Sequence, residues 1–332
     1  MLASRSQHPS NQTGIHFINA HNLTLERVQV QAVGGCVNSS NPTGACHNPC
    51  TARLTACHNI WGDQTTGVAI SDARVEGGST GIELSNCEGA VLSRVAARNV
   101  RGPFPRGQCV QFSHSDGATL QNFTCVNEEN KSWTEDAISA WRSSNVTIRQ
   151  GIVDGNNSPH GVGIMFEGSE AATHGGLIED VDAIHQGGGC FSGYPAQQLR
   201  QSGVRCAHSH CTGWAGRDKP MSGGHGWAAG NEDGVVSHGI VVEKAAYFDL
   251  CGPKLWWEQS PGGFAGLEDP AAPDAALGAT NLSSFTPRSW GLNVVMCWDG
   301  ADAPPPTAKQ LPVEVVAETE EEEEEEKMVE VS

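Results

Sequence analysis

The chain has 332 residues, a length that allows one large domain or two of ordinary size. Only 17% of the residues are charged and 6% are aromatic, whereas there are 40 glycines, and this mixture favours many short strands separated by turns. Half of the formal net charge of −18 lies in residues 313–332, which contain ten Glu, including the run Glu320–Glu326, and one Lys. The chain therefore carries no basic footprint for nucleic acid, and no apolar stretch is long enough for a membrane span.

Residues 1–13 precede the first strand pattern and lack the apolar segment of a signal peptide. We expect them to be a leader with a truncated start, because the repeat begins directly after them without a capping segment.

A repeat begins at Gly14 with GIHFINAH, and a second strand-like segment, NLTLERVQV, follows eight residues later. Similar apolar segments recur in steps of 28, 28, 26 and 27 residues, starting at Gly81, Cys109, Ala137, Gly163 and Cys190. A unit of about 27 residues cannot bury its own apolar side, so successive units must stack on one another. Strands repeated in one direction at a constant offset predict parallel pairing between successive coils.

Alternation along each strand assigns side chains to the two faces of the sheet. It directs Ile82/Leu84, Val110/Phe112, Ile138/Ala140 and Ile164/Phe166 into the core. The side chains that point outward then form two columns, Glu83, Gln111, Ser139, Met165, Ser192 and Ser85, Ser113, Trp141, Glu167, Tyr194.

These features predict an all-β chain with a parallel β-solenoid over residues 14–250 and loop insertions at 34–60 and 212–234. The repeated G-I-x-[FIL] and N-[VL]-T-[IL] segments resemble those of the right-handed parallel β-helix proteins of the pectin-lyase-like superfamily. That superfamily contains lyases, hydrolases, epimerases and non-catalytic adhesins, so the resemblance specifies architecture more closely than chemistry.

The cysteines fall into groups with different expectations. Cys36, Cys46, Cys50 and Cys57 crowd into the first insertion, where two disulfides are the first interpretation and a zinc site the second. The pairs Cys109/Cys190 and Cys125/Cys206 occupy equivalent core positions three coils apart, about 14 Å, which is too far for a disulfide. We therefore expect these four to be buried apolar residues. The cluster CAHSHC, with His208 and His210, is interpreted as a turn, with a metal site as the alternative.

The repeat fades after Gly252. We expect a loop-rich cap over residues 251–302, then a Pro-rich hinge and a disordered acidic tail over 303–332. Loop disulfides and eight N-x-[ST] sequons favour a secreted, extracellular protein, and we expect a monomer.

Candidate catalytic residues lie before two neighbouring strands. Glu135 and Asp136 precede AISAW, and His160 precedes GVGI. This arrangement resembles the polygalacturonase pattern, although Gln108 stands where that family has a further Asp. The resemblance implies that Asp136 is the general acid, Glu135 a companion base and His160 a modulator of their protonation.

A substrate-binding surface is predicted beside them. Trp141, Glu167 and Tyr194 form an outward line next to Arg142, and Gln111 lies in the neighbouring column. Aromatic faces pack against sugar rings, and charged groups fix hydroxyls or carboxylates. For a lyase or epimerase, Arg142, His160 and Asp136, or Tyr194 nearby, are the candidates to neutralise a uronate carboxylate and to exchange protons. Asp154 or Glu167 is a candidate Ca²⁺ ligand.

Two function classes remain open at the sequence level. One is an extracellular enzyme that acts on a polysaccharide, preferably one containing uronate, in the outer groove by lyase, epimerase or hydrolase chemistry. The other is a non-catalytic glycan-binding or surface protein that uses the same outward side chains.

Overall fold

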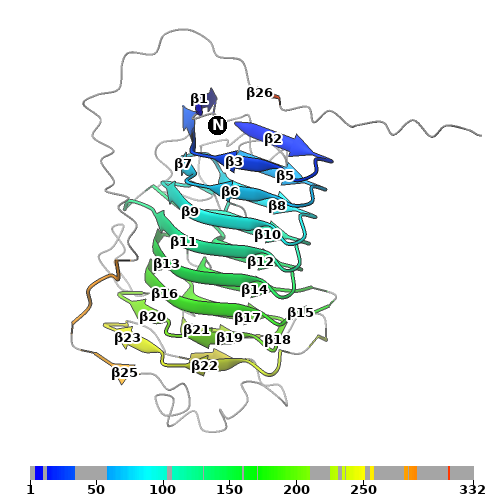
Figure 1. Cartoon of the computed structure of the whole chain (residues 1–332). Coiled ribbons are helices and arrows are strands. Elements are labelled where there is room, and N and C mark those ends of the chain that lie inside the picture. The colour runs from blue at the N-terminus through cyan, green and yellow to red at the C-terminus, as the bar shows by residue number, and fades with distance from the viewer. Residues whose placement is uncertain are drawn as a thin grey trace, which may run out of the picture.

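The repeating segments close into coils that stack along one axis, as Figure 1 shows from the blue N-terminal coils to the yellow last ones. The molecule is a right-handed parallel β-helix, and strands are the regular elements of its described residues. This computed structural model describes residues 4–9, 13–33, 58–102, 107–129, 131–158, 161–169, 171–209, 225–230, 234–235, 237–250, 255–257, 280–282, 284–289 and 313–314. Within these ranges there is no helix long and apolar enough to cross a membrane.

One sheet contains ten parallel strands and presents the predicted site on its outer face. In spatial order its strands are β24 (Leu255–Trp257), β21 (His225–Ala229), β17 (Gly189–Tyr194), β14 (Val162–Glu167), β12 (Asp136–Trp141), β10 (Val110–Ser113), β8 (Thr80–Ser85), β5 (His58–Asp63), β2 (Ile15–Ile18) and β26 (Val313–Glu314).

A fourteen-stranded sheet supplies the other sides of the coil. Its main path is β1 (Ser4–Pro9), β4 (Val28–Val33), β7 (Arg74–Glu76), β9 (Val91–Arg98), β11 (Thr119–Val126), β13 (Thr147–Asn156), β16 (Leu177–Gln186), β20 (Arg205–Ala207), β23 (Ala246–Phe248) and β25 (Thr280–Asn281). Off this path lie β3 (Thr24–Glu26), β6 (Ala69–Ser71), β19 (Arg200–Ser202) and β22 (Val241–Glu243). A two-stranded sheet joins β15 (Thr173–His174) to β18 (Ala196–Gln197).

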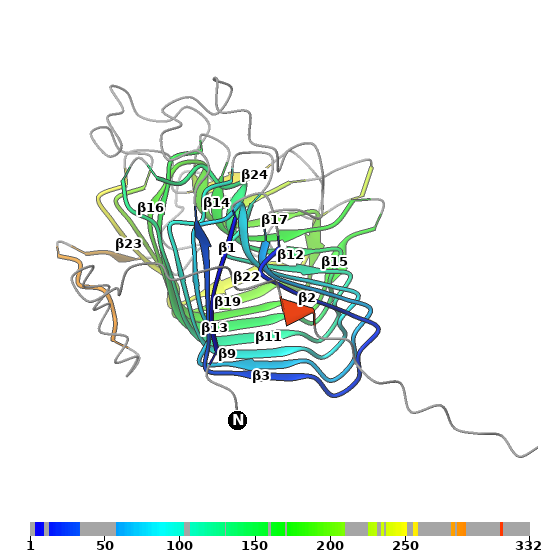
Figure 2. The same ribbon diagram turned by 90° about the horizontal axis from the view of Figure 1, so that it is seen from above.

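The long strands of the fourteen-stranded sheet turn a corner of the coil. The first part of β9 pairs with β6 and its last part with β7. Between the two parts, Arg94 has a φ of 53°, and Asn122, Gln150 and Asp180 repeat this left-handed conformation at 52°, 56° and 54°. Because each of these strands covers two sides, the coil has three sides, which are visible along the axis in Figure 2.

The predicted core register is confirmed. Ile82 pairs with Val110, which pairs with Ile138, and the ladder continues through Ile164 to Phe191. The eight side chains assigned to the core are all at most 1% exposed. They belong to one continuous apolar cluster that runs through the interior of the solenoid.

The expectation that four core cysteines are unpaired is wrong. Cys109 bonds to Cys125 and Cys190 bonds to Cys206, with Cα–Cα distances of 6.0 and 5.8 Å. Each disulfide crosses the interior between the two large sheets within a single coil, so the distance between coils does not limit it. Such buried disulfides are typical of extracellular proteins.

The predicted insertions are partly described. Residues 34–57, with Cys36, Cys46, Cys50 and Cys57, lie outside the described residues, as do His210 and Cys211. β5 begins at His58, so three residues assigned to the first insertion are part of a strand. Similarly, β21 falls within the second insertion and extends the ten-stranded sheet between β17 and β24.

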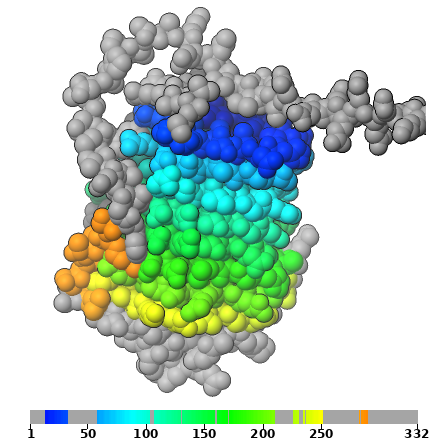
Figure 3. Space-filling model, in the orientation of Figure 1, coloured from blue at the N-terminus to red at the C-terminus, as the bar shows by residue number. Residues whose placement is uncertain are grey.

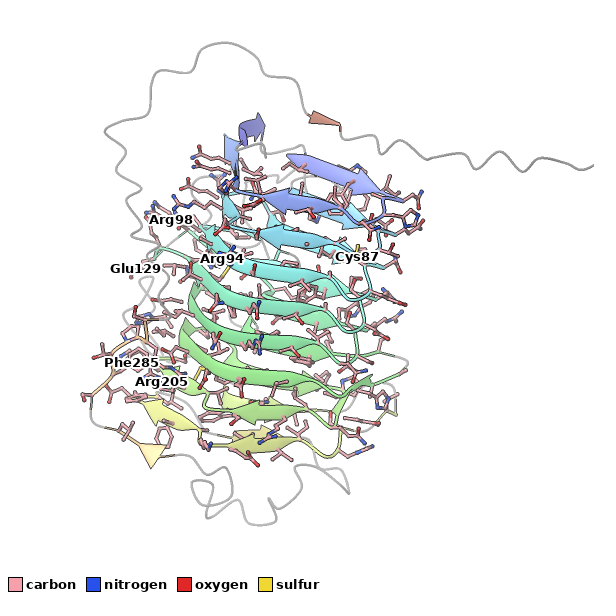
Figure 4. All side chains as sticks on the ribbon, in the orientation of Figure 1. Cys87, Arg94, Arg98, Glu129, Arg205 and Phe285 are labelled. Atoms are coloured by element: carbon pink, nitrogen blue, oxygen red, sulfur yellow. A yellow bond between two sulfur atoms is a disulfide. The ribbon has the colours of Figure 1, made fainter. Side chains whose placement is uncertain are left out.

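Described parts of the C-terminal region contact both ends and one side of the solenoid. β24 and β25 extend the two large sheets, and β26 pairs with β2 at the other end. Residues 284–289 lie along the side of the fourteen-stranded sheet, orange in Figure 3. There Phe285 lies 4.9 Å from the Phe248 ring and next to Arg205 (Figure 4). The acidic run of the predicted tail lies outside the described residues.

Candidate functional site

Two ladders of outward side chains run across the ten-stranded sheet. The first ladder consists of Trp61, Glu83, Gln111, Ser139, Met165 and Ser192. The second consists of Asp63, Ser85, Ser113, Trp141, Glu167 and Tyr194. The predicted alignment of Gln111, Trp141, Glu167 and Tyr194 on one face is therefore confirmed in register.

A break in the strand alternation brings Asp136 to this outer face. The amides of Gly81 and Ile82 both donate to the next coil, to the carbonyls of Gln108 and Cys109, whereas a regular ladder uses alternate residues. A Cβ on Gly163, one coil after Ala137, would lie 3.2 Å from the core side chain Val153. Ala137 and Gly163 therefore point inward, as do the residues that follow them, Ile138 and Ile164. The residue before Ala137, Asp136, points outward.

Asp136 is a buried carboxyl group with a perturbed pKa. It is 2% exposed, and its Oδ1 accepts a hydrogen bond of 3.0 Å from the amide of Val162. Burial, followed by the charges of Glu135 and Glu167, raises the pKa of Asp136 well above its ordinary value. A carboxyl group in this position keeps its proton at pH values where ordinary aspartates have lost it.

Glu135 is held beside Asp136 by the preceding coil. Gln108 donates from Nε2 to Glu135 Oε2 at 3.1 Å, and the Glu135 amide donates to the carbonyl of Gly107. Gln108 therefore positions the side chain of Glu135. The result is a carboxyl group with a raised pKa next to a second acidic side chain that a neutral amide holds in place.

Trp141 and Arg142 lie at the other end of β12. The Arg142 guanidinium carbon is 4.6 Å from the centre of the Trp141 ring, and the His114 ring meets Trp141 edge-on at 4.9 Å. The backbone amide of Arg142 donates to the Glu167 carbonyl at 2.7 Å. Trp141 is partly exposed, so this cluster offers an aromatic surface with a cation against it.

Tyr194 is the last residue of the second ladder and lies two coils after Trp141. It pairs with Glu167, and its ring occupies the space above Gly230, where a Cβ would lie 1.6 Å from the ring. A side chain at position 230 would therefore displace the Tyr194 ring. The predicted residues thus form two groups, with Glu135 and Asp136 at the start of β12 and Trp141, Arg142, Glu167 and Tyr194 at the strand ends.

Other predicted residues are not part of this arrangement. His160 lies outside the described residues. Asp154 belongs to β13 of the fourteen-stranded sheet, where its Oδ1 is 2.8 Å from His185 Nδ1. It is therefore on a different face from Glu167, and the described ranges contain no group of three or more His, Cys, Asp or Glu side chains that could hold a metal. In the CAHSHC cluster, His208 stacks on His185 at 5.6 Å.

Sequence reasoning missed a group of residues on the first coils. His58 Nε2 lies 2.7 Å from Glu83 Oε2, and Trp61 stacks on His16 with ring centres 4.1 Å apart. The sequence contained a signal for this strand, because Ile60 in HNIW pairs in register with Ile82 in GIEL. The 22 residues between them fall short of the usual repeat, so the strand was assigned to an insertion.

Comparisons with known proteins find structural likeness only. No protein-family model matches the chain, and no curated protein matches it in sequence. The catalytic domain of a GH87 alpha-1,3-glucanase in complex with nigerose matches with a TM-score of 0.39 and 12% identity, over 74% of this chain and 50% of that one. The Siphovirus 9NA tailspike receptor binding domain matches with a TM-score of 0.27 and 7% identity, over 87% and 73%. The assignment of a function therefore depends on the residues of the site.

Proposed function

We propose that the chain is a polysaccharide-cleaving enzyme that hydrolyses glycosidic bonds on the outer face of the ten-stranded sheet. The observation that carries this proposal is the buried carboxyl group of Asp136, whose pKa is raised by burial and by the charges of Glu135 and Glu167. Glycoside hydrolysis requires one carboxylic acid and one carboxylate with separated pKa values. Environments that separate the pKa values of neighbouring carboxyl groups are common at catalytic sites.

In the proposed reaction, Asp136 donates its proton to the glycosidic oxygen as the bond from that oxygen to the anomeric carbon breaks. A water molecule attacks the anomeric carbon and gives its proton to Glu135. The products are one new reducing end and one new hydroxyl group. A proton returned from Glu135 to Asp136 through solvent restores the starting state, and Glu167 is the second carboxylate that keeps the proton on Asp136.

A lyase or epimerase acting on a uronate-containing polymer is the second candidate, and Arg142 favours it. Its guanidinium group lies against Trp141, where a sugar ring would place a C6 carboxylate within reach. In that reaction a base removes the C5 proton and Asp136 protonates the leaving oxygen. His160 and Tyr194 are the candidates for this base.

The first test incubates the full chain with pectate, alginate, ulvan and neutral glucans, following new reducing ends and unsaturated-uronate absorbance. We expect reducing ends without absorbance, and a loss of about 10²–10⁴-fold in kcat for Asp136→Asn, the usual contribution of a general acid. Asp154→Asn, on the other sheet, is the matched control and should keep full activity. Absorbance that accompanies the new ends would establish the lyase instead.

Binding of a polymer without cleavage, unchanged in Asp136→Asn, would replace the enzyme by the glycan-binding alternative. The two disulfides support the further proposal that the protein is secreted. This proposal predicts that protein isolated from outside the cell contains both disulfides, Cys109–Cys125 and Cys190–Cys206.

A further inference from the structure

A second cluster occupies the same outer face, nearer the N-terminal end of the solenoid. Trp61 of β5 stacks almost parallel on His16 of β2, with an angle of 13° between the rings. On its own strand Trp61 also lies beside His58, at 6.2 Å between ring centres. His58 in turn contacts Glu83 of β8 at 2.7 Å, which joins three strands through side chains alone.

The chemistry of this cluster suits a sugar. Trp61 and Glu83 are partly exposed, so they offer an aromatic face and a carboxylate edge to solvent. The His58 side chain is only 5% exposed, and no group among the described residues forms a hydrogen bond with its Nδ1. A buried polar atom without a partner is costly, and a hydroxyl group that enters the cluster would satisfy it.

The register gives the position of this cluster relative to Asp136. Trp61 is on β5, and β8 and β10 separate it from β12, so three strand spacings, about 14 Å, lie between them. In the other direction β14 lies one strand spacing from β12, and β17, which carries Tyr194, lies two spacings from it. Asp136 is therefore in the interior of a surface about 24 Å long.

We propose that Trp61, His58 and Glu83 form a remote sugar-binding subsite, so that the enzyme cleaves linear polysaccharides internally and needs a chain of about six sugar residues for full binding. This inference rests on the proposed function. A pyranose ring is about as long as one strand spacing, so a chain laid across β5 to β17 places one sugar on each strand. A site for terminal sugars would instead have Asp136 at one end of the surface.

The test uses the polysaccharide that the wild-type chain cleaves and oligosaccharides of increasing length prepared from it. Binding is measured by calorimetry on the full-length Asp136→Asn chain, which separates affinity from turnover. We expect Trp61→Ala and Glu83→Gln to lower the affinity for long oligosaccharides about tenfold and to leave that for disaccharides unchanged. His238→Ala, an exposed histidine outside this face, is the control.

Trp61→Phe preserves an aromatic ring and should retain most of the affinity, which guards against misfolding as the cause of a loss. Product sizes from the active chain should show internal cuts, with a rapid fall in polymer length. Equal losses for short and long ligands, or products released one sugar at a time, would overturn the subsite while hydrolysis stands. Failure of the wild type to bind or cleave any polymer would overturn both the subsite and the proposed function.

Discussion

At the scale of single residues, Asp136 is a carboxyl group that is both buried and close to other acidic side chains. It is almost completely buried, yet it lies next to Glu135 and shares the field of Glu167, so its charged form is disfavoured on both accounts. The backbone amide of Val162 donates a hydrogen bond to Asp136 and thereby favours its carboxylate form. A proton held on Asp136 relieves this conflict, and the same proton is the one the proposed reaction donates.

The raised pKa of Asp136 predicts how stability depends on pH. The folded state prefers the protonated form, so its contribution is fully present below the ordinary pKa of 3.8 and is lost as pH rises through the raised value. Asp136→Asn removes this loss, because its amide oxygen still accepts the Val162 hydrogen bond. We expect the Tm of the variant to exceed that of wild type by a margin that grows as pH rises from about 4 to 8.

Thermal unfolding across this pH range measures the effect. Asp72→Asn is a useful contrast, because the hydrogen bond from Arg94 lowers the pKa of Asp72 and its stabilisation is lost as pH falls. A constant or shrinking margin for Asp136→Asn would mean that Asp136 is ionised in the folded protein.

At the scale of elements, the two disulfides act as cross-links within a coil. Cys109 immediately precedes β10 and Cys125 belongs to β11, so the bond joins the ten-stranded sheet to the fourteen-stranded sheet through the core. A solenoid has few contacts between distant coils, and such a link therefore stabilises its own coil and the two neighbours.

Replacement of both Cys109 and Cys125 by Ser should lower the free energy of unfolding by about 3 kcal/mol, since the sequence separation is 16 residues. The control is Cys87→Ser. Cys87 lies at a buried corner where its thiol donates to the Ser85 carbonyl, and Ser115 makes the same type of contact to Ser113 one coil later. Denaturant midpoints measure both; a loss for Cys87→Ser as large as that of the double variant would contradict this account.

At the scale of the whole molecule, the segment 284–289 fastens the C-terminal region to the side of the solenoid. Arg288 donates to the Asp182 carboxylate from its backbone amide at 2.9 Å, from Nε at 2.8 Å and from Nη2 at 2.6 Å. Arg205 binds the same carboxylate, whose side chain is completely buried. Phe285 covers the adjoining apolar cluster around Phe248.

Arg288→Ala should therefore lower the free energy of unfolding by about 1–3 kcal/mol, because the buried Asp182 loses the two side-chain donors Nε and Nη2 and keeps the backbone amide and Arg205. Arg200→Ala is the matched control, since its ion pair with Glu243 is 61% and 44% exposed and is worth about 0–1 kcal/mol. Chemical unfolding of the two variants compares them directly. Equal effects would mean that residues 284–289 add nothing to the solenoid.

The β-helix itself could be predicted from the sequence, because its repeat is local. Gly at turns and apolar residues at Ile82, Val110 and Ile138 recur at nearly constant spacing, and each unit can bury its apolar side only by stacking. The same alternation aligned Trp141 with Glu167 and Tyr194. Shorter or interrupted units defeat this reasoning, which is why the strand at His58 was assigned to an insertion.

The tertiary structure alone decided the features that depend on the closed coil. Spacing along the chain compares equivalent positions of successive coils, whereas Cys109 and Cys125 meet across the interior of one coil. The alternation break that turns Asp136 outward, and the burial that keeps its proton, also arise only when neighbouring strands are in place. Repetition in the sequence thus determined the architecture, and contacts between sheets determined the chemistry, because a pKa and a disulfide depend on distance in space.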